Sequence, residues 1–551
     1  MSRLKPYLFS VVITAGFFVL VEGFLYTTGF KYTPREKIYW RPMITMFEGT
    51  RQRNIETRFD YPGYIWRTIP NTPYTDSRGF RRPEVADEKP PGTIRIAFLG
   101  GSTTHGGYRP YPERVVALLN DALGEDRYEA LNAACSSYST LQSRVALERW
   151  VLPLDPDMVF VYHGWNDPQV QHDGYGDHEK YRTSDQTRTS WLLALARVRS
   201  LRIGQAMAGL LDWADYTWPR PRVTPDEFRA NLDDIARQCD RAGVPLWVAT
   251  RPRTRRLNTA RSLYGTKPLE RQYYSTLTRS TDAAAVYGEI HRLYTDIQRD
   301  VALRHANAQL CDLSTLIDDL QQRQLADRLG PHLTIFREDD CHLYEFAEQQ
   351  MAQYIALTVA PQHRKAVVRH IDSYAYNAAT ARLMLAEEQP GGALFYAARA
   401  AVAEPSRAHE LADLMYAAER NVRFVELFHQ GRPGTKGDFA DKLAKLKTCL
   451  ALRPDDFGVV WQIYRLCVHA DQVDQVAEVL AEFRPDNPED TRQWLSISLE
   501  SHIIGERLNP AFRTANQLLR VDPDNKQANA FLAHVRQVFE SQGTAPQEPT
   551  N

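Results

Sequence analysis

The sequence is short of cysteine and of net charge. Its six cysteines are widely separated along 551 residues, and no two form a Cys-x-x-Cys pair. That spacing excludes a recognisable zinc ribbon and argues against a disulfide scaffold. The formal net charge is -1, which argues against a polyanionic partner such as nucleic acid. The length exceeds what one hydrophobic core supports, so two or three domains are expected.

A long apolar run lies at the N-terminus, over residues 6–30. It exceeds the roughly 20 residues that cross a bilayer as a helix, and its one charged residue, Glu22, is near enough to one end to reach the interface. A cleaved signal peptide is the alternative, but no small-x-small cleavage site follows the apolar core. Residues 1–30 are therefore expected to be a single-pass anchor in the inner (cell) membrane, with the folded part facing the periplasm or exterior. Basic residues flank both ends, so charge alone does not decide this orientation.

From residue 93 to 362, strand-like and helix-like segments alternate. The expected strands are 93–99, 128–132, 158–162, 244–250 and 309–313, and amphipathic segments cover 112–123, 141–152 and 225–242. This alternation predicts a parallel sheet with helices on both faces, which is a three-layer α/β/α fold. Residues 31–92 are rich in aromatics and proline and are expected to form an extended wrap over that domain.

After residue 365 the strand signals disappear. Arg453-Pro-Asp-Asp, Arg484-Pro-Asp-Asn and Asp522-Pro-Asp-Asn follow amphipathic segments at spacings of 31 and 38 residues. These spacings bracket the roughly 34-residue period of tetratricopeptide (TPR) repeats. We expect an all-α TPR-like solenoid over residues 366–540, whose concave surface could bind a protein partner, and a disordered polar tail over 541–551.

One candidate for chemistry follows the first expected strand. Residues 93–99 end in Gly100-Gly101, and Ser102 comes next. A hydroxyl at the carboxyl end of a buried parallel strand lies where open α/β sheets bind ligands. The same pattern also describes an ordinary helix N-cap. Taken alone, Ser102 leaves both interpretations open.

Three further segments follow strands or open helices, so a doubly wound sheet would bring them to the same edge. They are residues 132–138, Gly164-Trp165-Asn166-Asp167 and Asp339-Asp340-Cys341-His342. In isolation, the third is also typical of a common loop, and the last of a capping or surface pair. Their joint occurrence in this order favours catalysis.

The chemistry of these residues is complementary. A serine hydroxyl needs a base to become nucleophilic, and His342 can supply one. Asp339 can fix the imidazole tautomer. The amide of Asn166, together with the backbone N–H groups of Ser102 and of the segment around residue 137, can donate hydrogen bonds to a developing oxyanion.

These four segments resemble the four blocks of the SGNH hydrolases, also called the GDSL esterase/lipase superfamily. The lead-in Gly79-Phe80-Arg81 also resembles membrane-anchored bacterial members with helical-repeat tails. The resemblance implies a flavodoxin-like α/β/α fold and ester hydrolysis or acyl transfer through an acyl-serine, without a metal or cofactor. It further implies that Ser102 is the nucleophile, His342 the base and Asp339 its orienting partner. The implied oxyanion donors are Ser102, Ser137 and Asn166.

One departure from the family pattern stands at position 137, where the family has glycine. Serine keeps the backbone N–H, but its Cβ resists a left-handed backbone or crowds the substrate. Weak activity or a narrower acyl pocket is expected. Three neighbouring features are expected to lie outside catalysis: His105 has a supporting or solvent role, Cys341 is a packing residue, and the run that begins at Arg251 is a solvated loop. That run could instead hold an acidic glycan.

We therefore expect a serine esterase that hydrolyses O-acyl, specifically O-acetyl, esters of a cell-envelope carbohydrate. Two alternatives remain open. The same acyl-serine could pass its acyl group to a sugar hydroxyl, which would make the protein an acyltransferase. Alternatively, the α/β domain could be a catalytically weak remnant, and the solenoid a scaffold for envelope or polysaccharide assembly proteins.

Overall fold

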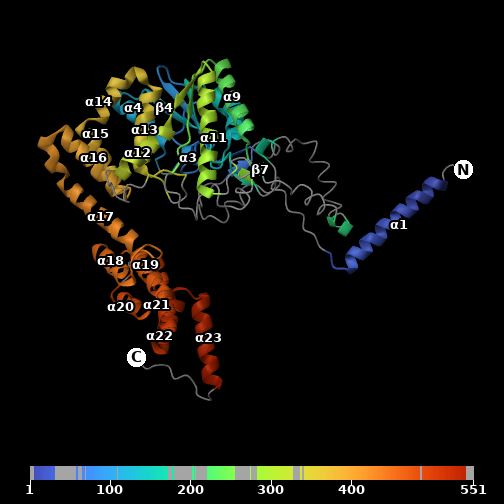
Figure 1. The fold of residues 1–551 in the computed structure, drawn as a ribbon, viewed down its shortest axis with the longest axis vertical. Helices are drawn as coiled ribbons and strands as arrows, with labels where there is room; N and C mark the ends of the chain where they lie inside the picture. Colours follow the sequence, from blue (N-terminus) through green and yellow to red (C-terminus); the bar gives the residue numbers. More distant parts are fainter. Residues whose placement is uncertain are drawn as a thin grey trace. The chain divides into compact units, whose positions relative to one another are not determined.

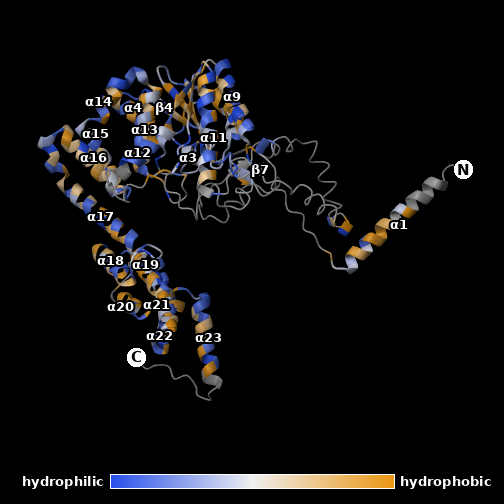
Figure 2. Ribbon diagram, viewed as in Figure 1, coloured by the Kyte–Doolittle hydropathy of each residue, from blue (hydrophilic) through white to orange (hydrophobic). Residues whose placement is uncertain are grey.

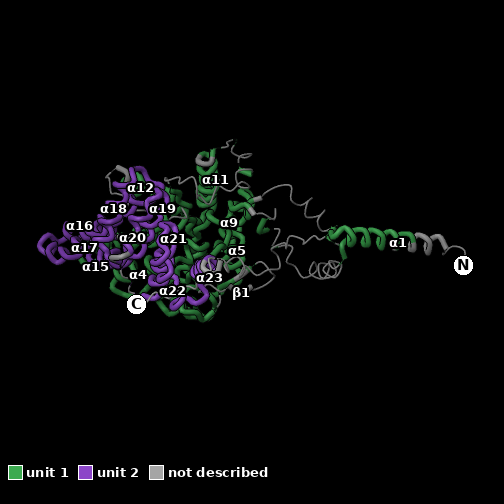
Figure 3. The backbone as a smooth tube through the Cα atoms, turned by 90° about the horizontal axis from the view of Figure 1, so that it is seen from below, with its two compact units in different colours: residues 1–328, 334–377 green, residues 329–333, 378–551 purple. Residues whose placement is uncertain are grey.

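The chain forms two compact units, each with its own core (Figure 3). The first takes in the described residues up to Asn377, and the second those from Ala378 onward. The computed structural model describes residues 5–30, 57–59, 65–68, 70–107, 109–171, 176–178, 181, 201–203, 205–206, 220–254, 273–274, 279, 282–326, 335–337, 341–483, 485 and 487–541.

The N-terminal apolar run forms helix α1 (Lys5–Thr27), whose described part is mostly apolar (Figure 2). Among the residues that the structure describes, however, no helix is long and apolar enough to cross a membrane. Glu22 interrupts the apolar run, and its carboxylate accepts hydrogen bonds from the backbone N–H groups of Arg202 and Ile203 at 2.7 and 2.8 Å. The predicted single-pass transmembrane anchor is therefore wrong, and so is the inner-membrane localisation that depended on it.

A five-stranded parallel sheet organises the first unit (Figure 1). Its order is β4-β3-β5-β8-β9, and all four pairings are parallel. The strands are β3 (Ile94–Gly100), β4 (Tyr128–Asn132), β5 (Met158–Tyr162), β8 (Leu246–Ala249) and β9 (Ala308–Cys311). The predicted parallel α/β sheet is thus confirmed. In the register, Gly100 pairs with Tyr162 and Phe98 with Asn132, so β3, β4 and β5 end at one edge.

Helices cover both faces of this sheet. On one face α4 (Tyr111–Leu123) packs on β4 and against α13 (Glu345–Val359), and on the other α11 (Ala283–Arg304) packs on β8 and β9 and against α9 (Pro225–Arg241) (Figure 1). The described part of this unit also contains the short helix α3 (Ser102–His105), and α5 (Thr140–Ala146), α12 (Leu313–Ala326) and α14 (Arg364–Ile371).

Two helix termini in this unit have clear local features: the start of α9 and the end of the segment that begins with α5. At the start of α9, Thr224 and Glu227 form a reciprocal capping box with proline at the first helical position. The segment predicted as one helix over 141–152 is instead α5 followed by a π-helical turn (Leu147–Val151) and a 3-10 turn (Leu152–Leu154). That segment ends at Asp155, whose φ of 49° is left-handed.

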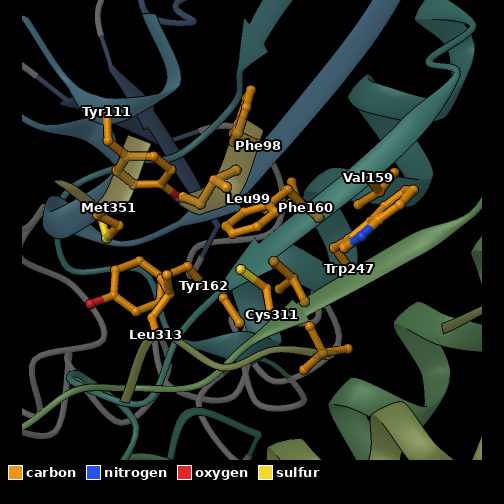
Figure 4. Close-up of a cluster of buried hydrophobic side chains, with 14 of the residues drawn as sticks. Phe98, Leu99, Tyr111, Val159, Phe160, Tyr162, Trp247, Cys311, Leu313 and Met351 are labelled. Atoms are coloured by element: carbon orange, nitrogen blue, oxygen red, sulfur yellow. The ribbon is translucent and has the colours of Figure 1, made fainter. Parts of the chain in front are cut away.

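The core beneath the sheet edge is aromatic. Phe98 of β3 and Tyr162 of β5 meet Tyr111 of α4 edge to face, with ring centroids 5.8 and 6.1 Å apart (Figure 4). All three side chains are buried. The Tyr111 hydroxyl lies 3.2 Å from Thr104 Oγ1, two residues beyond Ser102. The core therefore fixes the turn that carries the candidate nucleophile.

The described part of the segment before β3 is joined to the same core. Phe80 and Val85 are buried in the hydrophobic cluster of the sheet. The backbone N–H of Arg81 donates to the carbonyl of Asn132 at 3.0 Å, which extends the edge of the sheet beside β4. Most of residues 31–64 lies outside the described part of the chain.

The second unit is helical, with no strand among its described residues. Its helices are α15 (Tyr374–Ala386, which begins just before the boundary), α16 (Pro390–Ala403), α17 (Ala412–Gly431), α18 (Phe439–Leu452), α19 (Phe457–His469), α20 (Asp474–Glu482), α21 (Pro488–Ile504), α22 (Leu508–Val521) and α23 (Lys526–Ser541). From α16 to α23 each helix packs on the next. The turns that begin at Arg453 and Asp522 lie between α18 and α19 and between α22 and α23. Arg484, which starts the third, is outside the described residues.

Candidate active site

Two glycines allow the chain to turn tightly after β3. Ser102 opens the short helix α3 (Ser102–His105) directly after them. A Cβ on Gly100 would lie 2.1 Å from Thr104 Oγ1 and 2.8 Å from the carbonyl oxygen of Tyr162. A Cβ on Gly101 would lie 2.6 Å from the side-chain nitrogen of Asn166. The turn therefore needs glycine at both positions because its neighbours approach so closely.

Folding brings Ser102 to His342, 240 positions later in the chain. The His342 Nε2 atom lies 2.9 Å from Ser102 Oγ, which is hydrogen-bond distance. The turn that carries His342 is fixed by backbone pairing with the segment just before it: the Arg337 N–H donates to the His342 carbonyl at 2.8 Å, and the Tyr344 N–H to that of Ile335 at 2.9 Å.

The other ring nitrogen of His342 faces its own turn. Its Nδ1 lies 3.5 Å from the Sγ atom of Cys341, whose side chain is buried. Asp339, the predicted orienting carboxylate, lies outside the described residues. Within the described ranges, no group of three or more His, Cys, Asp or Glu side chains is placed to hold a metal ion.

The two remaining predicted donors lie on adjacent loops beside the nucleophile turn. The Asn166 side chain donates from Nδ2 to the carbonyl of Tyr138 at 2.9 Å, and its Oδ1 accepts a hydrogen bond from Gln169 at 3.3 Å. Asn166 therefore links its own loop to the one that carries Ser137. Ser137 has a φ of 65°, so the backbone is left-handed at the position where the family has glycine.

We expect Ser137→Gly to stabilise the protein. A left-handed backbone costs an L-residue about 1–2 kcal/mol, whereas glycine adds roughly 0.4–1 kcal/mol of unfolded-state entropy. The free energy of unfolding should therefore rise by about 0.5–1 kcal/mol, as measured by chemical denaturation. The backbone N–H is retained, so kcat should not fall. If the glycine variant had a lower free energy of unfolding, the contacts of the serine side chain would stabilise the protein by more than the left-handed backbone destabilises it.

Arg251 was expected in a solvated loop or at a glycan site, and the structure corrects this. Its side chain is fully buried directly after β8. It donates from Nη1 to the carbonyl of Gly164 at 2.5 Å, and its guanidinium lies 4.6 Å from the centroid of the Trp165 ring. Trp165 in turn lies edge to face with Phe336, with centroids 6.3 Å apart. Because Phe336 pairs with Leu343, these contacts connect the Asn166 loop to the His342 turn.

A buried polar network that the sequence did not indicate anchors the loop after Ser137. Thr140 donates from both its backbone N–H and its hydroxyl to Asp167 Oδ1, at 2.8 and 2.6 Å. The Ser139 hydroxyl donates to Asp177 at 2.7 Å, and Arg222 forms a buried ion pair with that carboxylate at 2.9 Å. Asp177 and Arg222 are 45 positions apart, so no local spacing could have predicted the pair.

The first unit contains three buried histidines among its described residues, namely His105, His163 and His291. Burial, which disfavours the charged ring, lowers the pKa of His105 to about 4 and the pKa values of His163 and His291 to about 3. Burial also raises the pKa of Asp167 to about 6. His105 has no part in the contact between Ser102 and His342, and its burial excludes the alternative of a solvent-facing role.

These shifts predict that the protein loses stability in mild acid. Below pH about 6.5 the unfolded chain protonates its histidines while the folded chain keeps them neutral, so the free energy of unfolding falls as the pH drops. Each histidine lowers the free energy of unfolding by about 1.4 kcal/mol per pH unit in this range. Asp167 acts in the opposite direction, because its carboxylate is protonated at a higher pH in the folded chain than in the unfolded chain, and this offsets the effect of one histidine. Chemical denaturation at pH 7 and pH 5 should therefore differ by several kcal/mol, and His163→Gln should reduce the difference. Equal stability at the two pH values would contradict the assignment of neutral buried histidines.

The site thus combines the groups that acyl transfer requires. A serine hydroxyl lies at hydrogen-bond distance from an imidazole, and a side-chain amide and a left-handed backbone lie beside it. An imidazole can remove the serine proton, and N–H groups can stabilise a developing oxyanion. Of the predicted residues, the structure brings together Ser102, His342 and the loops that carry Asn166 and Ser137.

The sequence profile of the GDSL-like lipase/acylhydrolase family matches residues 98–345, a span that contains all four predicted blocks. Similar solved structures include an α/β hydrolase from the metagenome of Lake Arreo, Spain (17% identity, 50% of this chain, 96% of the other, TM-score 0.29). They also include a catalytic mutant of an acetylxylan esterase from Geobacillus stearothermophilus (15%, 49%, 95%, 0.29) and a lipase/acylhydrolase from Enterococcus faecalis (16%, 49%, 97%, 0.28). No curated protein matches the chain. The assignment rests on the family profile: residues 98–345 belong to the GDSL-like lipase/acylhydrolase family, and the protein is an ester hydrolase.

Proposed function

We propose that the protein is a serine esterase that hydrolyses short O-acyl esters, specifically O-acetyl esters of a carbohydrate, through an acyl-serine. Ser102 is the nucleophile and His342 the general base. The observation that carries this proposal is the 2.9 Å distance between His342 Nε2 and Ser102 Oγ. Asp339 is proposed to accept the Nδ1–H of His342, which would fix the tautomer whose Nε2 can take a proton.

In the proposed mechanism, His342 Nε2 removes the proton from Ser102 as Oγ attacks the ester carbonyl carbon. The carbonyl oxygen becomes an oxyanion, stabilised by the backbone N–H groups of Ser102 and Ser137 and by the Asn166 amide. His342 then gives its proton to the departing alcohol oxygen, which leaves Ser102 acylated. A water molecule, deprotonated by the same nitrogen, attacks the carbonyl carbon of the acyl-serine. The bond from that carbon to Ser102 Oγ then breaks, Oγ takes the proton back from His342, and the carboxylic acid leaves.

The preference for a short acyl group rests on Ser137. Serine at this left-handed position adds a Cβ and a hydroxyl to the loop that carries the proposed oxyanion donor, where the family has only a glycine hydrogen. That additional volume reduces the space for the acyl chain, which favours acetyl over longer groups. The carbohydrate half of the ester rests on the family resemblance alone.

Labelling with a fluorophosphonate tests the proposal, because this reagent reacts with activated serines. The intact mass should increase by one adduct, and peptide mapping should place it on Ser102. A panel of acyl esters, led by acetylated sugars and p-nitrophenyl acetate and butyrate, then measures the acyl preference. A folded protein that takes up no adduct would refute the esterase mechanism.

We also propose that helices α18–α23 form a TPR-like array that offers a surface to a protein partner. Three helix pairs begin at residues 439, 474 and 508, so successive pairs are offset by 35 and 34 residues. These offsets support the interpretation, since the TPR period is about 34 residues. Packing between consecutive helices is also typical of solenoids. Pull-down with residues 378–551 deleted, compared with the full chain, tests whether a partner depends on this region.

A further inference from the structure

A pocket of about 420 Å³ lies within the second unit, away from the catalytic residues in sequence. It opens where the start of α18 and the end of α19 come together beside the loop that follows α17. Its size falls in the range of small-molecule sites. The residues that matter for its chemistry are apolar (Pro433, Phe439, Leu466) and basic (Lys442, Arg465, His469).

The basic residues around this pocket have no acidic partner among the described residues. Lys442, Arg465 and His469 form no side-chain hydrogen bond or ion pair within that part of the chain. The nearby carboxylates have other partners. Asp438 caps α18 by accepting the backbone N–H of Asp441 at 2.7 Å, and the Asp441 carboxylate binds Lys445 at 2.6 Å.

Lys442 is the most informative of the three. Its side chain is in the first turn of α18, and the residue is only 8% exposed. Its Nζ atom is not among the buried, unpaired side-chain nitrogens of the described residues, so the apolar stem is buried while the ammonium stays accessible at the pocket. The first turn of a helix is also the end that repels cations. The positive charges of Arg465 and His469 are favoured by the helix dipole, because both residues are near the C-terminus of α19. Lys442 is near the N-terminus of α18, where the dipole disfavours a positive charge.

We propose that this pocket binds a small amphiphilic carboxylic acid. The carboxylate would be held by Lys442, Arg465 and His469, and its apolar body would lie against Phe439 and Leu466. Charge complementarity requires an anion, and the apolar lining favours a ligand with a hydrophobic body over a bare inorganic ion. Binding here does not depend on the proposed reaction at Ser102.

Isothermal titration of the full-length protein with sodium octanoate tests this proposal. Octanoate should bind saturably, whereas octan-1-ol, which lacks the charge, and sodium phosphate, which lacks the apolar body, should not compete with it. Lys442→Met keeps the buried stem and removes the charge, so octanoate affinity should fall by about tenfold or more. Lys442→Arg should retain binding, and Lys445→Met is the matched control on the same helix.

Two readouts separate this site from the catalytic one and from misfolding. Ester hydrolysis by Lys442→Met should match that of the unmodified protein, even if octanoate also enters the acyl site. The thermal midpoint should not fall, because methionine keeps the buried stem and the charge that is removed has no acidic partner among the described residues. Unchanged octanoate affinity in a folded Lys442→Met variant would overturn the proposal, and so would equal binding of octan-1-ol or phosphate.

Discussion

Ser102→Ala should reduce kcat for acyl-ester hydrolysis by at least about 10⁴-fold and abolish fluorophosphonate labelling. The Oγ atom of Ser102 lies 2.9 Å from His342 Nε2, so its removal takes away the hydroxyl from which the imidazole is proposed to accept a proton. In serine hydrolases the loss of the nucleophile removes nearly all of the catalysis that the triad provides. The measurement is kcat and KM for p-nitrophenyl acetate together with the intact mass of the labelled protein.

A matched control comes from a serine outside the site. Ser77 is exposed and hydrogen-bonds to Glu84, so Ser77→Ala should retain full labelling and activity. Ser102→Ala should also keep its thermal midpoint, because it removes one partly exposed oxygen without leaving a cavity. If labelling persisted in Ser102→Ala, another serine would be the nucleophile and the proposed mechanism would be wrong.

Gly101→Ala should reduce kcat by roughly 10²–10³-fold with little change in KM. The added Cβ would lie 2.6 Å from Asn166 Nδ2 and 3.2 Å from the Tyr138 carbonyl oxygen, so the amide must move away from the nucleophile turn. The backbone at Gly101, with φ of -92° and ψ of -151°, is accessible to alanine, so the effect is steric. The loss of an oxyanion donor typically costs a factor of this size and acts on the transition state.

Gly107, six positions after Gly101, provides a control substitution of the same kind. A Cβ on Gly107 would meet nothing within 4 Å, so Gly107→Ala should leave kcat unchanged. Asn166→Ala should lose about as much as Gly101→Ala, and the double variant should lose little more, since both changes remove the same donor. Fully additive losses would mean that Gly101→Ala acts through some route other than Asn166.

The sheet could be predicted closely because its strands are short, apolar and buried on both faces. The expected strands 128–132 and 158–162 match β4 and β5 to the residue. The predicted helix over 141–152 was wrong at its C-terminal end, since helical periodicity does not separate an α-helix from the π and 3-10 turns that follow α5. The membrane anchor predicted from the apolar N-terminal run was wrong: no helix among the described residues is long and apolar enough to cross a membrane, and the Glu22 carboxylate within that run accepts backbone hydrogen bonds from residues 180 and 181 positions later.

The candidate site was predictable only where its residues occur in recognisable blocks. Ser102 and His342 belong to such blocks, and the fold brings them to hydrogen-bond distance. Arg251 and the pair formed by Asp177 and Arg222 support the site from outside the blocks. A buried arginine directly after a strand looks like a surface residue in sequence, because nothing local encodes the Trp165 ring and the Gly164 carbonyl that receive it.

The contacts of Arg251 also couple the local stability of the Asn166 loop to that of the His342 turn. Its guanidinium stacks on Trp165, and Trp165 packs on Phe336, whose backbone pairs with the turn that carries His342. A fluctuation that frees the Asn166 loop must therefore break the packing of the His342 turn as well. In native-state hydrogen exchange, the amide proton of Arg337, which bonds to the His342 carbonyl, should respond to Trp165→Ala although the two residues are remote in sequence. The proposed base and the proposed oxyanion donor would then open and close together as one cooperative unit.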